Sequence, residues 1–79
     1  KTRFQLIQLK WQVGQQNSAQ EHFKIIGEDT DINVLLAAAV WGHEREMEHA
    51  KKLSRWARLS TANSQLYSQV DSILQQAGL

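Results

Sequence analysis

Residues 30–41, with the sequence TDINVLLAAAVW, constrain the fold most strongly, because their apolar side chains would cover a helix almost completely. A helix that is apolar on every face must be surrounded by other elements. We therefore expect a central helix with two packing neighbours, in which Leu35, Leu36 and Ala39 are nearly fully buried. Thr30 is placed to cap the first backbone N–H groups, and acidic residues nearby suit the positive end of the helix dipole.

The composition favours one small all-α domain. The chain has 79 residues and no proline, against an average usage of about 5%, so the strongest helix breaker is missing. It also has no cysteine, which excludes a disulfide framework and thiolate metal sites. No apolar run approaches the length of a membrane span. Because the first residue is Lys1 rather than methionine, we expect a processed protein or a fragment of a longer chain.

Glycines divide the chain into five expected helices. Gly14, Gly27, Gly42 and Gly78 each follow a plausible helix, where a left-handed residue is favoured, and the polar segment 60–64 adds another break. The expected helices cover residues 3–13, 17–26, 31–41, 43–59 and 64–77. We expect antiparallel hairpins, the first helix with the second and the third with the fourth, while the fifth would take a partner outside this chain.

Apolar residues at helical spacing predict which faces of the outer helices are buried. The predicted stripes are Ala19, Phe23 and Ile26; Met47, Ala50, Leu53 and Ala57; and Leu66, Val70, Ile73 and Ala77. Residues 3–13 leave a strand open as an alternative, because apolar and polar residues alternate from Ile7 to Val13. We favour a helix there, since the chain offers no convincing partner strand and one polar face of a helix would hold the glutamines Gln5, Gln8, Gln12, Gln15 and Gln16.

Two parts of the chain resemble the tetratricopeptide and pentatricopeptide class of helical-hairpin repeats. The first two segments keep the order of large apolar residue, turn glycine, small residue, aromatic residue and apolar residue, at Leu6, Gly14, Ala19, Phe23 and Ile26. The sequence INVLLAAAVWG from Ile32 aligns with YSQVDSILQQA from Tyr67, and the spacing of 67 − 32 = 35 is close to the unit length of the class. The resemblance implies a helical bundle or a short α-solenoid segment. In an RNA-reading array, Val34 and Gln69 would face the bases.

The segment HEREMEH, residues 43–49, is a candidate metal site, because a helical HExxH motif places two histidines on one face. Met47 stands where the motif needs its second histidine, and His43 and His49 are six residues apart. On a helix their side chains would point in different directions. We therefore favour a solvated, charged helix start and expect no metal or other cofactor.

The candidate partner-binding residues lie in the fourth expected helix. Its basic side chains are either a solvated face that complements the C-terminal end of the helix dipole or a stripe that contacts phosphates. Trp56 lies off the predicted apolar stripe, so it either covers a second neighbour or anchors a partner, as tryptophan and arginine often do at interfaces. The candidate site residues are Trp56, Arg55, Arg58, Lys51 and Lys52.

No set of nucleophile, base and orienting residue can be assembled, so we do not expect an enzyme. We expect a non-catalytic protein-interaction module or a segment of an α-helical scaffold, with a protein partner. One alternative is an RNA or single-stranded nucleic-acid binder that uses the basic stripe, with Trp56 and Tyr67 as stacking surfaces. Another is a small helical bundle that inhibits a second protein. Oligomer formation is left open.

Overall fold

The computed structural model describes residues 2–79, which form five α-helices and no strand. The all-α prediction is confirmed, and the helical interpretation of the first segment is correct. The helices are α1 (Arg3–Gln12), α2 (Gln16–Phe23), α3 (Ile32–Glu44), α4 (His49–Leu59) and α5 (Ser64–Gln76). None of the helices in this range has the length and apolar character needed to cross a bilayer.

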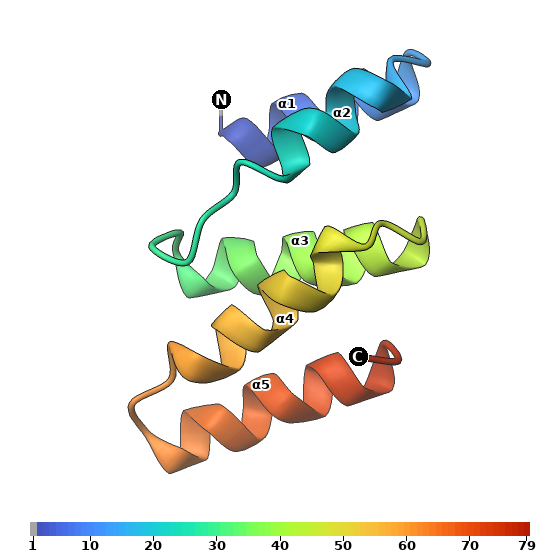
Figure 1. The fold of residues 1–79 in the computed structure, drawn as a ribbon. Coiled ribbons are helices and arrows are strands. Elements are labelled where there is room, and N and C mark those ends of the chain that lie inside the picture. Colours follow the sequence, from blue (N-terminus) through green and yellow to red (C-terminus); the bar gives the residue numbers. More distant parts are fainter. Residues whose placement is uncertain (1) are drawn as a thin grey trace.

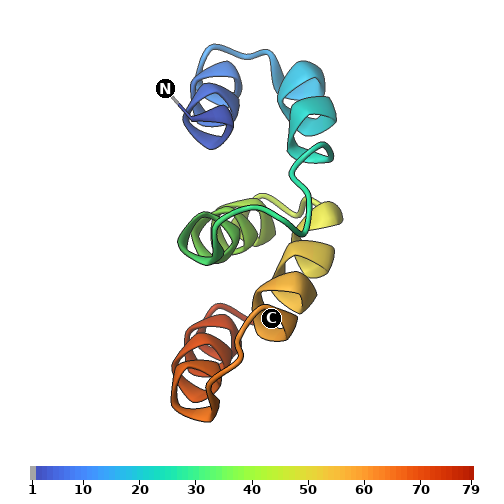
Figure 2. The ribbon, with the colours of Figure 1, turned by 90° about the vertical axis from the view of Figure 1, so that its left-hand side faces the viewer.

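The helices pack as two successive antiparallel hairpins followed by α5 (Figure 1). The α1–α2 hairpin lies at one end, the α3–α4 hairpin in the middle, and α5 packs against α4 and α3. Viewed from the side, α1, α3 and α5 form one row and α2 and α4 form the other (Figure 2). The molecule is therefore elongated along the direction of stacking, with extents of 39 × 23 × 17 Å.

Helix α3 supplies the centre of the core, as predicted. Leu35, Ala38 and Ala39 are fully buried. Leu36 is only partly buried, which corrects the prediction that it would be nearly inaccessible. Because α4 covers one side of α3, the opposite side, with Leu36 and Val40, is left as the floor of an open groove. The apolar residues that surround this helix therefore form part of a solvent-accessible surface as well as part of the core.

The expected helix break at Gly42 is wrong, because α3 continues to Glu44 and Gly42 is buried within it. The reversal comes later, in a turn where Glu46 has a φ of 57°. Gly42 is required for packing instead: a Cβ at this position would lie 2.5 Å from Cζ of Phe23 and 3.2 Å from the Cβ of Ala50. Because glycine has no side chain, the ring of Phe23 can pack against the backbone of α3 at this position.

The other glycines divide into two groups. Gly14 and Gly78 have φ values of 89° and 93°, which confirms the predicted left-handed helix ends. Gly27 does not have a positive φ, and the helix expected to reach residue 26 stops at Phe23. The predicted cap of α3 also moves by one residue, since the side chain of Asp31, not Thr30, accepts a hydrogen bond from the backbone N–H of Asn33.

The buried stripes of α2 and α4 are confirmed, because every predicted residue of these two stripes is buried. The prediction for α5 is only partly correct. Val70 is buried, but Leu66 and Ile73 are exposed, and Leu74 provides the second buried contact. The neighbours of α5, which are α3 and α4, lie on the Leu74 side of the helix.

The first hairpin joins the rest of the molecule through aromatic rings. The ring of Trp41 on α3 lies 5.7 Å from those of Phe4 and Trp11 on α1 and 6.1 Å from that of Phe23 on α2, measured between centroids. The first two contacts are edge-to-face, an arrangement that aromatic pairs favour. The two hairpins therefore meet through large side chains rather than through close approach of their backbones.

Candidate functional site

The candidate residues of α4 fall into two groups that contact different parts of the molecule. Arg58 faces α5, where its Nε donates a hydrogen bond of 2.8 Å to Oδ1 of Asp71. Its two terminal nitrogens also lie 3.3 and 3.4 Å from the carbonyl oxygen of Leu79. The structure thus places Arg58 in the α4–α5 contact and separates it from Lys51, Lys52 and Arg55.

Trp56 is partly buried and packs against the core. Its ring lies 5.8 Å from that of His49, which lies 5.8 Å from the ring of Phe23. The series of rings connects α4 to α2, so Trp56 covers the α2–α4 side rather than α5 or α1. Lys52 Nζ lies 5.4 Å from the centroid of Trp56, close enough for a cation–π interaction.

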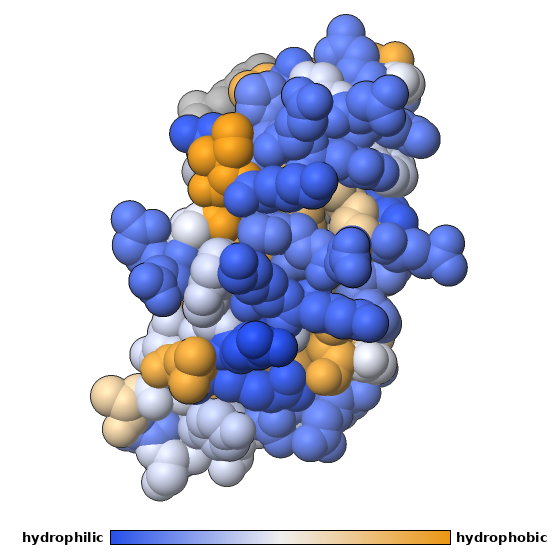
Figure 3. Space-filling view, in the orientation of Figure 1, coloured by the Kyte–Doolittle hydropathy of each residue, from blue (hydrophilic) through white to orange (hydrophobic). Residues whose placement is uncertain are grey.

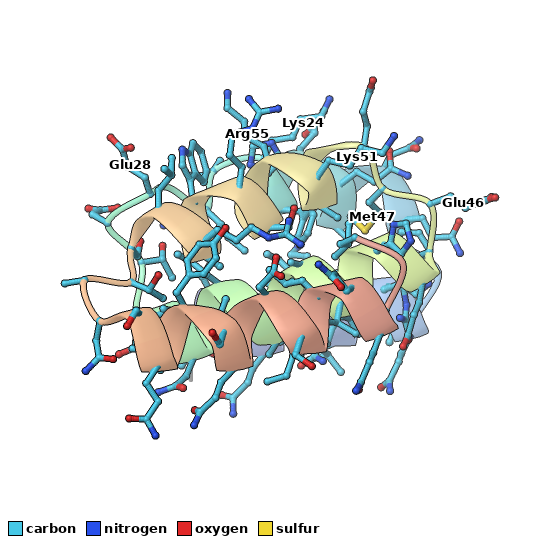
Figure 4. All side chains as sticks on the ribbon, turned by 90° about the horizontal axis from the view of Figure 1, so that it is seen from below. Lys24, Glu28, Glu46, Met47, Lys51 and Arg55 are labelled. Atoms are coloured by element: carbon cyan, nitrogen blue, oxygen red, sulfur yellow. The ribbon has the colours of Figure 1, made fainter. Side chains whose placement is uncertain are left out.

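Lys51, Lys52 and Arg55 share a shallow depression with a cation that sequence reasoning missed. This is Lys24, at the C-terminal cap of α2. We call Lys24, Lys51, Lys52 and Arg55 the basic cluster. All four side chains are exposed, and Figure 4 shows Lys24, Lys51 and Arg55 on the same side of the molecule. Glu48 and His49 complete the lining of the depression.

The start of α4 changes the electrostatic interpretation of this cluster. In a helix covering 43–59, the lysines would lie well inside and the basic residues would complement the C-terminal end of the dipole. In the structure α4 begins at His49, so Lys51 and Lys52 lie in its first turn, which contains no acidic residue. Positive charge at that end of a helix is unfavourable. The helix dipole therefore does not account for the two lysines in the first turn of α4.

Within residues 2–79, no cation of the cluster forms a salt bridge. Among residues 2–79, the salt bridges within 4.0 Å are Arg45 with Glu44 and Arg58 with Asp71, and neither includes a cation of the cluster. The face formed by α2 and α4 is mostly hydrophilic, with separate apolar patches (Figure 3).

A second candidate surface runs along the α1–α3–α5 row. Two adjoining depressions, of about 810 and 530 Å³, share Gln8 and Trp41 and so form one continuous groove, which we call the amide groove. Its polar lining is dominated by uncharged amides, and its apolar lining includes side chains that are partly exposed. The amides are Gln5, Gln8, Gln12 and Asn33, and the apolar residues include Leu6, Leu9, Leu36, Val40 and Ile73.

Charge in the amide groove is confined to one side. Glu44 and Arg45 form a salt bridge of 3.5 Å, and the guanidinium carbon of Arg45 lies 4.3 Å from the centroid of Trp41. The rest of the groove therefore offers apolar surface together with side chains that can both donate and accept hydrogen bonds. The predicted glutamine face of the first helix lines this groove. A pattern within one helix could not show that residues of α3 and α5 would line the same groove.

The histidines of the 43–49 segment are separated in the structure. His43 lies beside Gly78, whereas Nε2 of His49 lies 3.4 Å from the carbonyl oxygen of Ile26. Over the range 2–79, no three histidine, cysteine, aspartate or glutamate side chains come together as a metal site requires.

Comparison with protein-family models, with curated proteins and with solved structures gave no match to this chain.

Proposed function

We propose that this chain is a non-catalytic protein-interaction module whose amide groove binds an extended segment of a partner protein. The observation that carries the proposal is the continuous groove along α1, α3 and α5. Such a groove combines apolar contacts, which supply affinity, with amides that can pair with a peptide backbone, which fix orientation. Leu6 and Leu9, 42% and 46% exposed, would contact the partner's side chains.

The arrangement of the helices supports a place for this chain in a helical scaffold of the hairpin-repeat type. Two pairs of residues 35 positions apart in α3 and α5 have matching environments, since Leu35 and Val70 are both buried, as are Ala39 and Leu74, whereas Ala38 is buried and Ile73 is exposed. A repeat that stacks the first helix of each unit in one row produces an extended surface of this kind. We propose that α1, α3 and α5 are the corresponding helices of successive units.

Nucleic-acid binding is the weaker candidate. Arg58 is engaged with Asp71 and with the carbonyl oxygen of Leu79, and Glu48 lies within the basic cluster. The pairing of Arg58 removes one free cation, and the carboxylate of Glu48 offsets part of the positive charge, which together weaken attraction to a phosphate backbone, on which affinity for nucleic acid largely depends.

A peptide display library selected against the 79-residue chain tests the proposal. Selected peptides should bind Leu9→Asp at least ~10-fold more weakly, because a carboxylate would replace an apolar contact in the groove. The matched control is Leu59→Asp, since Leu59 is 75% exposed and lies outside the groove. Peptides that bind the two variants with equal affinity, or a library from which no groove-dependent binder emerges, would refute the proposal.

A further inference from the structure

The basic cluster carries more positive charge than the chain as a whole. Its depression is lined by four cations and by one carboxylate, that of Glu48, which gives a formal charge of +3, whereas the whole chain carries +1. The remaining residues therefore carry a formal charge of −2 together. A local field of this sign attracts anionic partners and orients them before contact.

The positions of the cations are fixed by the packing beneath them. Phe23 and His49 are in edge-to-face contact, as are His49 and Trp56, so the end of α2 is held against α4. Lys24 follows Phe23 directly and is thereby kept beside the first turns of α4. The cluster is a defined surface built from two helices, and its charges do not derive from one basic run of sequence.

We propose that the basic cluster docks a carboxylate-rich segment of a protein partner. Lys51 and Arg55 are four residues apart on one helix, a separation of about 6 Å at a rise of 1.5 Å per residue. Side chains two residues apart in an extended peptide are separated by about 7 Å and point in the same direction. Acidic residues at alternate positions of an extended segment therefore match the spacing of the two cations.

The surroundings of the cluster favour a short acidic segment over a nucleic acid. Figure 4 shows Glu28 and Glu46 on opposite sides of the group formed by Lys24, Lys51 and Arg55. A continuous polyanion that followed the line between these two residues across the cluster would meet a carboxylate at each end. A segment with two or three acidic side chains can satisfy the cations without doing so, because its charges end where the cluster ends.

This surface is separate from the amide groove, and the proposal does not depend on the groove. The test uses fluorescence anisotropy with the full chain and a labelled pentapeptide of alternating glutamate and glycine, which carries three glutamates, in 50 mM and 150 mM salt. A peptide with glutamine in place of glutamate should not bind. An oligodeoxythymidine of equal charge serves as the competing class of ligand.

Charge reversal of Lys51→Glu together with Arg55→Glu should weaken binding of the glutamate peptide by at least ~10-fold. The matched control, Arg3→Glu with Lys10→Glu, changes the net charge equally but alters α1, so its affinity should stay within ~3-fold of that of the original chain. Lys24→Glu gives an independent measurement from α2, in case the double variant of α4 does not fold. Circular dichroism establishes which variants are folded.

The outcomes separate the alternatives. Loss of binding in the cluster variants, with retention in the α1 control, supports the proposal. Equal losses in both would show that only net charge matters and would overturn it. Tighter binding of the oligodeoxythymidine than of the glutamate peptide would also overturn it, in favour of a nucleic-acid partner. NMR shift changes on peptide addition should center on residues 24 and 51–56, and changes confined to other residues would reject the assignment of the surface.

Discussion

The absence of a side chain at Gly42 determines how α2 meets α3. The ring of Phe23 occupies the space that a methyl group would need, and α3 passes through the glycine without a break. Sequence reasoning recognised that Gly42 was structurally special but assigned it to a helix end, because glycine favours that position. Its actual partner, Phe23, is 19 positions away, and a local pattern cannot reveal such a contact.

Gly42→Ala should therefore destabilise the fold by about 1–3 kcal/mol, the usual cost of overpacking a core. Helix propensity alone would favour alanine at an interior position by roughly 0.5–1 kcal/mol, so the sign of the change decides between the two effects. Urea unfolding followed by circular dichroism measures it. Combining the change with Phe23→Leu should recover part of the loss. A variant as stable as the original chain would show that the contact is not limiting.

At the level of the helices, sequence patterns predicted buried faces better than helix ends. The stripe of α4 from Met47 to Ala57 was correct because its apolar residues follow a single helical period. In α5, Val70 belongs equally to a stripe with Ile73 and to one with Leu74, and the choice depends on neighbours from other helices.

The start of α4 was missed, since the turn contains Glu46 rather than a glycine at its left-handed position. Lys24 was missed because it joins the basic cluster from a different helix.

The position of Lys51 in the first turn of α4 predicts that Lys51→Glu increases stability by about 0.3–1 kcal/mol, because a carboxylate suits that end of the helix dipole. Lys10 lies in the last turn of α1, so Lys10→Glu should have the opposite effect. Thermal melts at low salt measure both changes. If Lys51→Glu lowers the melting temperature, the helix dipole does not determine the effect of charge at this position, and the lysine is not a destabilising feature of α4.

For the whole molecule, the critical element is the aromatic contact between hairpins. Trp41→Ala would remove the ring that Phe4, Trp11 and Phe23 all contact, while leaving the α3–α4 core intact. We expect a loss of about 2–4 kcal/mol, somewhat less than for a fully buried tryptophan. Hydrogen exchange should accelerate first in α1 and α2, with α3 and α4 still protected. Uniform acceleration through all five helices would instead show that the chain unfolds as a single cooperative unit.

The same contact holds the first hairpin in place against α3. Residues 24–31, which form no helix, link the two hairpins covalently, and within them Ile26 is buried in the core, while Phe23 adds a ring contact with His49 on α4. Aromatic pairs favour the edge-to-face arrangement found here, so these contacts fix the orientation of the first hairpin as well as its position. Trp41 is thus both the joint between the hairpins and part of the lining of the amide groove, so Trp41→Ala should change the shape of the groove as well as the stability of the fold.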